Sequence, residues 1–244
     1  MANAEGCVKK RLVVLSDSLG RPRPEIDGAD KTELWQVYGS ILQTLLGDDW
    51  VVDLIYIDSL DSDDAIHWNQ RMVAYRRPDL VIYHLGINDC APRLFSKGSR
   101  SILLHSWFKF VTRDIGVRVL SRYRRFFTRV RKITYVPLSR FAANLRCMLQ
   151  DVLEYSPGCR FIAVLIATPA ASLVGRSHGY GANVERYNAV LKELFPNHVD
   201  VDSLLLGDSP LIADGIHLQA RAHKMLAEKI HACIVQTGGH SCVE

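Results

Sequence analysis

The fold is indicated first by one stretch, Leu12-Val13-Val14-Leu15-Ser16-Asp17-Ser18-Leu19-Gly20. Four apolar residues run into small polar residues and end at a glycine, a pattern typical of a buried parallel strand followed by a turn. Parallel sheets bind ligands just beyond the carboxyl ends of their strands. Ser18 therefore lies at a candidate reactive position. The alternative is a simple turn in which serine and aspartate cap the next helix.

The rest of the chain alternates between strand-like and helix-like patterns. Strands are predicted at residues 12–15, 51–57, 80–85, 161–167 and 199–201. Helices are predicted between them at residues 33–46, 64–76, 141–155, 183–195 and 219–235. Because such alternation places helices on both faces of a parallel sheet, we predict a single α/β domain over residues 1–244.

The composition argues against several classes of protein. Of the 244 residues 48% are hydrophobic, which is enough for a sizeable core, but no segment approaches the roughly 20 apolar residues of a membrane span. Residues 1–10 lack the apolar core of a secretory signal, so we expect a cytoplasmic protein. The six cysteines form no CxxC pair, which disfavours a zinc site or a disulfide framework. We expect no metal and no organic cofactor.

A second motif ends the predicted strand at residues 80–85, which continues as Gly86-Ile87-Asn88-Asp89. An asparagine at the carboxyl end of a strand is placed to donate its side-chain amide to a developing oxyanion. The alternative is a turn in which Asn88 and Asp89 cap the following segment.

A third motif, Ala213-Asp214-Gly215-Ile216-His217-Leu218, precedes the last predicted helix. A carboxylate three residues before a histidine reaches the imidazole, fixes its tautomer and stabilises its positive charge after it has taken a serine proton. Other histidines, such as His84, His178 and His223, have no such carboxylate companion. For these histidines we expect surface or packing roles.

Together the three motifs resemble the SGNH (GDSL-type) hydrolase family, in which they occur in this order and strand context over the whole chain. The resemblance implies a flavodoxin-like three-layer α/β/α sandwich with a central parallel sheet of about five strands. It also implies that Ser18 is the nucleophile, that His217 is the general base and acid, and that Asp214 orients the histidine. The implied oxyanion donors are the Ser18 N–H, a glycine N–H and the Asn88 side chain. Asp17 and Gly86 are the implied substrate-binding neighbours.

The sequence departs from the family pattern at two positions. Ser16 stands where the family has glycine, a change that a relaxed turn tolerates. The glycine of the oxyanion hole is expected after the strand at residues 51–57, and Asp58 is the nearest match. Any non-proline residue supplies a backbone N–H, but glycine allows a positive φ, and a carboxylate disfavours a nearby oxyanion unless it points away. This departure puts the efficiency of catalysis in question.

A basic insertion is predicted at about residues 95–140. Between Arg113 and Arg146 the chain carries ten basic residues and one acidic residue. Apolar residues recur in this stretch at three-to-four spacing, which predicts an amphipathic helix: Ile115, Val119, Tyr123, Phe126, Phe127 and Val130. An aromatic cluster precedes them: Trp107, Phe108 and Phe110.

Three roles for this helix stay open. In the first, the apolar face of the helix packs on the domain. In the second, Arg122, Arg124 and Arg125 belong to a lid and receive an anionic substrate. In the third, the helix lies on an anionic membrane surface. Nucleic acid is disfavoured, because no recognition module accompanies the charge.

We predict a serine esterase that hydrolyses O-acyl esters, above all O-acetyl esters, of a small-molecule or carbohydrate substrate. The segments at residues 18–25 and 90–93 also resemble a bacterial branch of SGNH proteins associated with surface-polysaccharide biosynthesis, which implies an O-acetylated sugar. The alternatives are an acyltransferase to a sugar hydroxyl, a lipid esterase or lysophospholipase, and a degenerate binding protein that has lost catalysis.

Overall fold

The computed structural model describes residues 9–26, 28–97, 121–204 and 209–238. Its centre is a five-stranded parallel sheet with the strand order β2-β1-β3-β4-β5. The strands are β1 (Lys10–Ser16), β2 (Trp50–Tyr56), β3 (Leu80–His84), β4 (Arg160–Val164) and β5 (His198–Val199). This is the strand order of flavodoxin-like folds, in which β2 lies on one side of β1 and the later strands lie on the other side.

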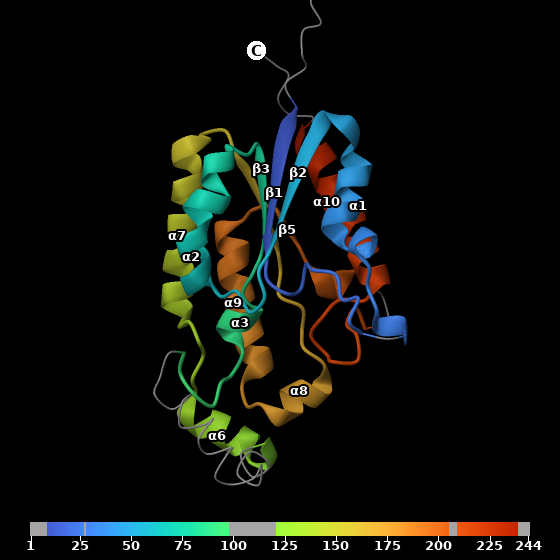
Figure 1. The fold of residues 1–244 in the computed structure, drawn as a ribbon. Coiled ribbons are helices and arrows are strands. Elements are labelled where there is room, and N and C mark those ends of the chain that lie inside the picture. The colour runs from blue at the N-terminus through green and yellow to red at the C-terminus, as the bar shows by residue number, and fades with distance from the viewer. Residues whose placement is uncertain (1–8, 27, 98–120, 205–208, 239–244) are drawn as a thin grey trace, which may run out of the picture.

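Helices cover both faces of the sheet (Figure 1). On one face lie α1 (Tyr38–Leu46) and α10 (Ala220–Gly238). On the other face lie α2 (Ser62–Met72), α7 (Leu138–Tyr155) and α9 (Tyr180–Leu194). The predicted three-layer α/β/α sandwich is confirmed.

The two faces of the sheet have separate hydrophobic cores because side chains alternate along each strand. Val13 and Leu15 of β1 pack in the core beneath α2, α7 and α9, whereas Leu12 and Val14 pack in the core beneath α1 and α10. All four side chains are fully buried. A continuous apolar run is therefore the sequence that a central parallel strand requires.

Three short helices lie at the carboxyl end of the sheet: α3 (Ile87–Cys90), α6 (Arg124–Arg131) and α8 (Ala171–Arg176). Single 3₁₀ turns occupy five further positions: Gly28–Asp30, Leu34–Gln36, Gly47–Asp49, Ala74–Arg76 and Val201–Ser203. The predicted helix at residues 33–46 is divided, because Val37 is extended (φ −80°, ψ 146°) between a 3₁₀ turn and α1.

The basic insertion contributes α6, and its other residues from 98 to 120 lie outside the described part of the chain. Ile115, Val119 and the aromatic cluster at residues 107–110 are among these. In the described part, the helix begins at Arg124, and its residues do not pack as the amphipathic pattern predicts.

Most apolar side chains of α6 and its N-cap face solvent, with Phe127 half-buried, whereas some of its arginines face the domain. Three of the predicted packing residues are largely exposed: Tyr123 (53%), Phe126 (59%) and Val130 (64%). Arg124 donates to the carbonyl of Pro92 (3.0 Å) and Arg131 to that of Leu94 (2.6 Å). Hydrogen bonds from guanidinium groups therefore attach α6 to the segment that contains Pro92 and Leu94, whose carbonyls accept them.

Among the described helices, none has the length and apolar character that crossing a membrane requires.

Candidate active site

The three sequence motifs meet at the carboxyl end of the sheet. Ser18 follows β1, and Asn88 lies in α3, which follows the neighbouring strand β3. The Asp17 N–H donates to the carbonyl of His84 (3.3 Å), which ties the two loops together. This is the switch point of the strand order, where parallel sheets of this kind bind their ligands.

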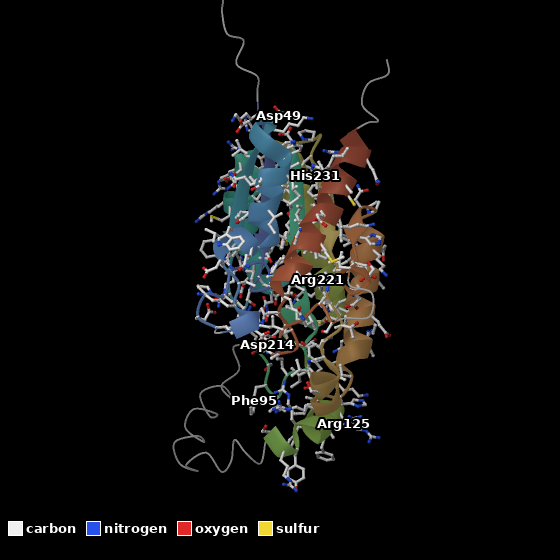
Figure 2. The ribbon with its side chains drawn as sticks, turned by 90° about the vertical axis from the view of Figure 1, so that its right-hand side faces the viewer. Asp49, Phe95, Arg125, Asp214, Arg221 and His231 are labelled. Carbon is white, nitrogen blue, oxygen red and sulfur yellow. The ribbon has the colours of Figure 1, made fainter. Side chains whose placement is uncertain are left out.

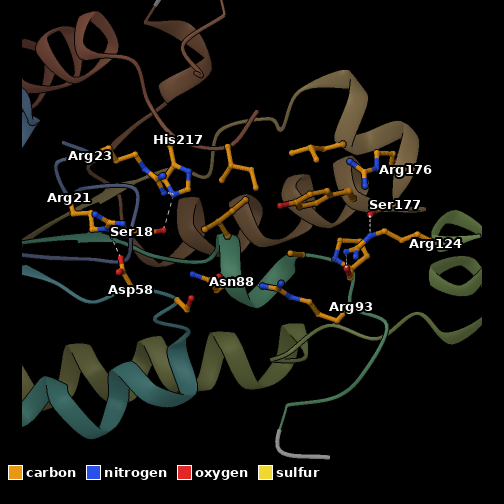
Figure 3. Close-up of a pocket in the computed structure, with 17 residues that line it drawn as sticks. Ser18, Arg21, Arg23, Asp58, Asn88, Arg93, Arg124, Arg176, Ser177 and His217 are labelled. Atoms are coloured by element: carbon orange, nitrogen blue, oxygen red, sulfur yellow. Dashed lines mark hydrogen bonds and ion pairs between the residues drawn. The ribbon is translucent and has the colours of Figure 1, made fainter. Parts of the chain in front are cut away.

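Ser18, His217 and Asp214 form a hydrogen-bonded chain. The Ser18 Oγ lies 3.0 Å from His217 Nε2 (Figure 3). On the other side of the ring, His217 Nδ1 lies 2.6 Å from Asp214 Oδ2. Because an ionised carboxylate only accepts hydrogen bonds, Nδ1 carries the proton and Nε2 presents its lone pair to the serine hydroxyl. This is the geometry of a nucleophile, a base and an orienting carboxylate.

The loop that carries Asp214 and His217 is stabilised by the carboxylate itself. Asp214 Oδ1 accepts the backbone N–H groups of Ile216 (2.9 Å) and His217 (3.0 Å). Burial acts to raise the pKa of Asp214, but these N–H groups and the imidazole hold it below its ordinary value. Gly215 between them has φ +75°, and its carbonyl accepts the N–H of Ala170. Asp214 is therefore ionised at neutral pH.

Two other histidines at this end of the sheet are not bases. Burial lowers the pKa of both His84 and His223 to about 3, so each is neutral at physiological pH. Both side chains are 2% exposed, and each ring lies against Tyr38. These contacts agree with the packing roles that we expected from their lack of a carboxylate companion.

Arg23 is a second neighbour of the His217 imidazole. Its Nη2 lies 2.5 Å from His217 Nε2, the same atom that faces Ser18, so Arg23 and the Ser18 hydroxyl compete as donors for the single lone pair of that nitrogen. Burial lowers the pKa of His217 below its ordinary value; Asp214 opposes this shift, and the positive charges of Arg23 and Arg21 add to it. The imidazole is therefore held neutral, as a general base must be.

We expect the acid limb of the kcat/KM profile to have an apparent pKa below 6.5, the ordinary value for histidine. Activity is lost as the pH falls through this pKa, because a protonated His217 accepts no proton from Ser18. In the Arg23→Gln variant a positive charge is removed, so the limb shifts to higher pH. Rates measured from pH 4 to 9 would contradict this account if the limb stays in place or shifts to lower pH in the variant.

Asn88 is positioned next to Ser18 by Asp17. The Asn88 amide Nδ2 donates to Asp17 Oδ2 (3.1 Å) and to the Leu60 carbonyl (3.2 Å), while Asp17 Oδ1 accepts the Leu19 N–H (2.8 Å). Burial raises the pKa of Asp17 to about 8, so at pH 7 it is mostly neutral and a weaker acceptor.

Asp89 attaches the Asn88 loop to the start of α2. Its Oδ1 accepts both the backbone N–H (2.9 Å) and the hydroxyl (2.5 Å) of Ser62, and Asn144 donates to the same hydroxyl. Burial raises the pKa of Asp89 to about 7. This carboxyl group is fully buried and positions the loop rather than reaching the cavity.

Gly86 is required for the turn that leads into α3. Its backbone has φ +120°, and a Cβ there would lie 2.7 Å from the Ile166 side chain. We expect Gly86→Ala to lower the free energy of unfolding by about 1–3 kcal/mol. Gly158→Ala is the matched control, because no atom lies within 4 Å of its added Cβ. Equal urea midpoints for the two variants would contradict this role of Gly86.

The loop after β2 differs from the prediction at Asp58. The Asp58 carboxylate is 61% exposed and pairs with Arg21 Nε (2.6 Å), as Figure 3 shows. The left-handed backbone occurs one residue later, at Ser59 (φ +59°), which also lines the cavity. Ser59 thus has the conformation for which glycine is the usual residue. The carboxylate that seemed unfavourable beside an oxyanion is neutralised by its guanidinium partner.

A cavity of about 550 Å³ opens at Ser18 and His217. Asn88, Asp58 and Ser59 line it, together with five arginines: Arg21, Arg23, Arg93, Arg124 and Arg176. Of the three insertion residues predicted to receive an anion, only Arg124 lines this cavity. Arg122 is exposed, and Arg125 donates to the Gly175 carbonyl (2.8 Å).

Sequence reasoning did not assign Arg23, Arg93, Arg176 or Ser59 to the site. Arg23 and Arg93 fall within the segments that carry the weaker family resemblance, so a signal for them was present. Arg176 lies in the short helix α8 and reaches the cavity only through tertiary packing. Within the described residues, no three His, Cys, Asp or Glu side chains gather as a metal site requires.

No protein-family model matches the sequence, and no curated protein sequence matches it. Solved structures do match. The carbohydrate acetylesterase Est24 from Sinorhizobium meliloti superposes with a TM-score of 0.59 at 16% identity, covering 94% of this chain and 100% of that one. The aryl esterase of M. smegmatis gives a TM-score of 0.58 at 16% identity, covering 93% of this chain and 99% of that one.

A lipase/acylhydrolase from Enterococcus faecalis superposes with a TM-score of 0.62 at 12% identity, covering 93% of this chain and 96% of that chain. The chain has the SGNH-hydrolase fold. At such low identities the SGNH-hydrolase fold is what these structures share with it, and the chemistry of the site has to be argued from its own residues.

Proposed function

We propose that this protein is a serine esterase that hydrolyses O-acyl esters, acetyl esters above all, of a carbohydrate. The observation that carries the proposal is the hydrogen-bonded chain from Ser18 through His217 to Asp214, opening on a cavity. The carbohydrate substrate is supported by two of the similar structures, Est24 and an acetyl xylan esterase, whose names state such activities.

In the acylation step, the Ser18 Oγ attacks the ester carbonyl carbon while His217 Nε2 takes the hydroxyl proton. Asp214 stabilises the imidazolium that forms. The tetrahedral intermediate then collapses: the bond to the alcohol oxygen breaks, and His217 gives its proton to that oxygen. The acyl group remains on Ser18 as an ester. In the deacylation step, a water molecule attacks the acyl carbon while His217 takes its proton. The bond to the Ser18 Oγ then breaks, His217 returns the proton to that oxygen, and the carboxylic acid is released.

The oxyanion of the intermediate is stabilised by preorganised donors. We assign the backbone N–H groups of Ser18 and Ser59 and the amide of Asn88 to this role, with Ser59 in place of the Asp58 N–H predicted from the sequence. In the free protein, the two amide hydrogens of Asn88 are donated to Asp17 Oδ2 and to the Leu60 carbonyl. To stabilise the oxyanion, the amide turns one of these hydrogens toward it. The hydrogen bond to the neutral Asp17 is the weaker of the two and the easier to give up.

The test of this function is turnover of nitrophenyl acetate and nitrophenyl octanoate. Because five arginine side chains share the lining of the cavity with its apolar residues, a long acyl chain would have to remove water from charged groups there. We expect kcat/KM for acetate to exceed that for octanoate by about tenfold or more. A preference for octanoate would favour a lipid esterase instead. Turnover no faster than with the Ser18→Ala variant on both esters would contradict an esterase function.

A further inference from the structure

The charge of the cavity is unbalanced. Five arginines line it, and Asp58 is the single carboxylate among its lining residues. Arg21 is neutralised where it stands, since its guanidinium pairs with Asp58 (2.6 Å) and with Glu25 (2.9 Å). Arg23 lies near Asp214, which is itself engaged by His217. The other three arginines lie on the side of the cavity opposite Arg21 and Arg23, as Figure 3 shows.

Three arginines gather there, which we call the arginine trio: Arg93, Arg124 and Arg176. They come from the segment after α3, from α6 and from α8. No ion pair joins any of the trio to a carboxylate in the part of the chain that the structure describes. Their charges are therefore uncompensated by the described residues.

Among the described residues, the side chains of the trio contact neutral groups. Arg124 Nε donates to Ser177 Oγ (2.8 Å), and Arg176 Nη2 donates to Ser121 Oγ (3.5 Å). The guanidinium of Arg93 lies 4.1 Å from the centre of the Tyr135 ring. Such contacts orient the guanidinium groups without neutralising them.

Two further observations mark the trio as a binding site rather than a solvated surface. The Nε of Arg93 is buried and has no hydrogen-bond partner in the described part of the chain. Burial and the charges of Arg93 and Arg176 lower the pKa of Arg124. Like charges that repel one another in a half-buried cavity destabilise the free protein, and an anion between them would remove that repulsion.

Three guanidinium groups suit one kind of anion best. Each presents several N–H donors in a planar fork, which matches the oxygens of phosphate in bidentate fashion. A single carboxylate carries one charge and two oxygens, whereas a phosphate monoester or a pyrophosphate carries at least about two charges at neutral pH and more acceptor oxygens. A phosphate group therefore compensates the trio more completely.

We infer that the substrate is an acyl ester that also carries a phosphate or pyrophosphate group, and that Arg93, Arg124 and Arg176 bind this group while the ester lies at Ser18. The inference rests on the proposed function for the position of the ester. The cavity that joins the two ends, with its volume of about 550 Å³, accommodates a molecule of sugar-phosphate size.

The test measures binding of inorganic pyrophosphate to the Ser18→Ala protein by calorimetry, so that it requires no turnover. We expect saturable binding at low ionic strength, weakened about tenfold or more by Arg124→Gln and by Arg176→Gln. Arg176 is exposed, so its replacement leaves the fold intact. Arg125→Gln is the matched control: it removes the same charge from the same helix, but Arg125 lies outside the cavity, at the end of the molecule beyond Asp214 (Figure 2).

Three results would overturn the inference. The first is no binding of pyrophosphate, and the second is equal weakening by the Arg125→Gln control. The third is tight binding to phosphatidylglycerol vesicles without binding of free pyrophosphate, which would assign the charge to a membrane surface. Because the binding is measured on a protein without its nucleophile, a failed esterase assay and a failed phosphate site give separate results.

Discussion

Replacing Ser18 by alanine is expected to lower kcat/KM for nitrophenyl acetate by about 10⁴- to 10⁶-fold, the loss seen when the nucleophile of a serine hydrolase is removed. Alanine removes the Oγ that lies 3.0 Å from His217 Nε2 and leaves no atom to form the acyl-enzyme. Because the three side chains act as a unit, the Ser18→Ala/His217→Ala double variant should be no slower than either single variant.

The matched control is Ser40→Ala, a serine in α1 outside the cavity. Its kcat/KM should stay within about twofold of the parent, because Ser40 is half-buried in α1 and does not line the cavity. Circular dichroism and melting temperature should be the same for both variants. A Ser18→Ala protein that keeps more than a tenth of the parent activity would remove Ser18 from the mechanism.

The Asp214→Asn variant is expected to lose about 10⁴-fold in kcat. The asparagine oxygen still accepts the N–H groups of Ile216 and His217, so the loop keeps its shape. Its amide group, however, faces His217 Nδ1 with a donor where Oδ2 accepted at 2.6 Å. The imidazole then shifts its proton to Nε2 and presents an N–H, rather than a lone pair, to Ser18.

Nitrogen chemical shifts of His217 measure this change of tautomer directly. In the parent protein the proton should reside on Nδ1, and in Asp214→Asn it should reside on Nε2. Activity within about tenfold of the parent, or an unchanged tautomer, would mean that Asp214 does not orient the histidine.

The sheet and its main helices could be predicted because their signals are local and repeated. Each central strand is an apolar run, and the runs fall between helical patterns of nine residues or more. The short helices α3 and α8 were not predicted, because four and six residues are too few to display a helical period. The orientation of α6 was not predicted either, since its guanidinium groups bind backbone carbonyls that only the folded chain brings near.

The centre of the site could be predicted for a similar reason. Asp214 and His217 are three residues apart, so their contact is local, and Ser18 and Asn88 follow strands whose ends meet at one edge of the sheet. Ser59 could not be predicted, because a serine at positive φ leaves no mark in the sequence, whereas glycine would have done so.

The arginine trio could not be predicted from the sequence as a group that shares one cavity. Arginines are common on solvated surfaces, so an isolated one carries little information. Arg93, Arg124 and Arg176 are brought to one cavity by three segments that are distant in the chain. The sequence concentrates positive charge in the insertion at about residues 95–140, but Arg124 is the one member of the trio that belongs to it.

The central claim is that Ser18 is a nucleophile activated by His217. The most direct measurement treats the protein with a fluorophosphonate, which phosphonylates an activated serine hydroxyl and releases fluoride, and records the intact mass and the modified peptide. The account predicts one adduct per chain, on Ser18, absent from Ser18→Ala and much slower to form in His217→Ala. No adduct on the parent protein, or an adduct that persists in Ser18→Ala, would contradict it.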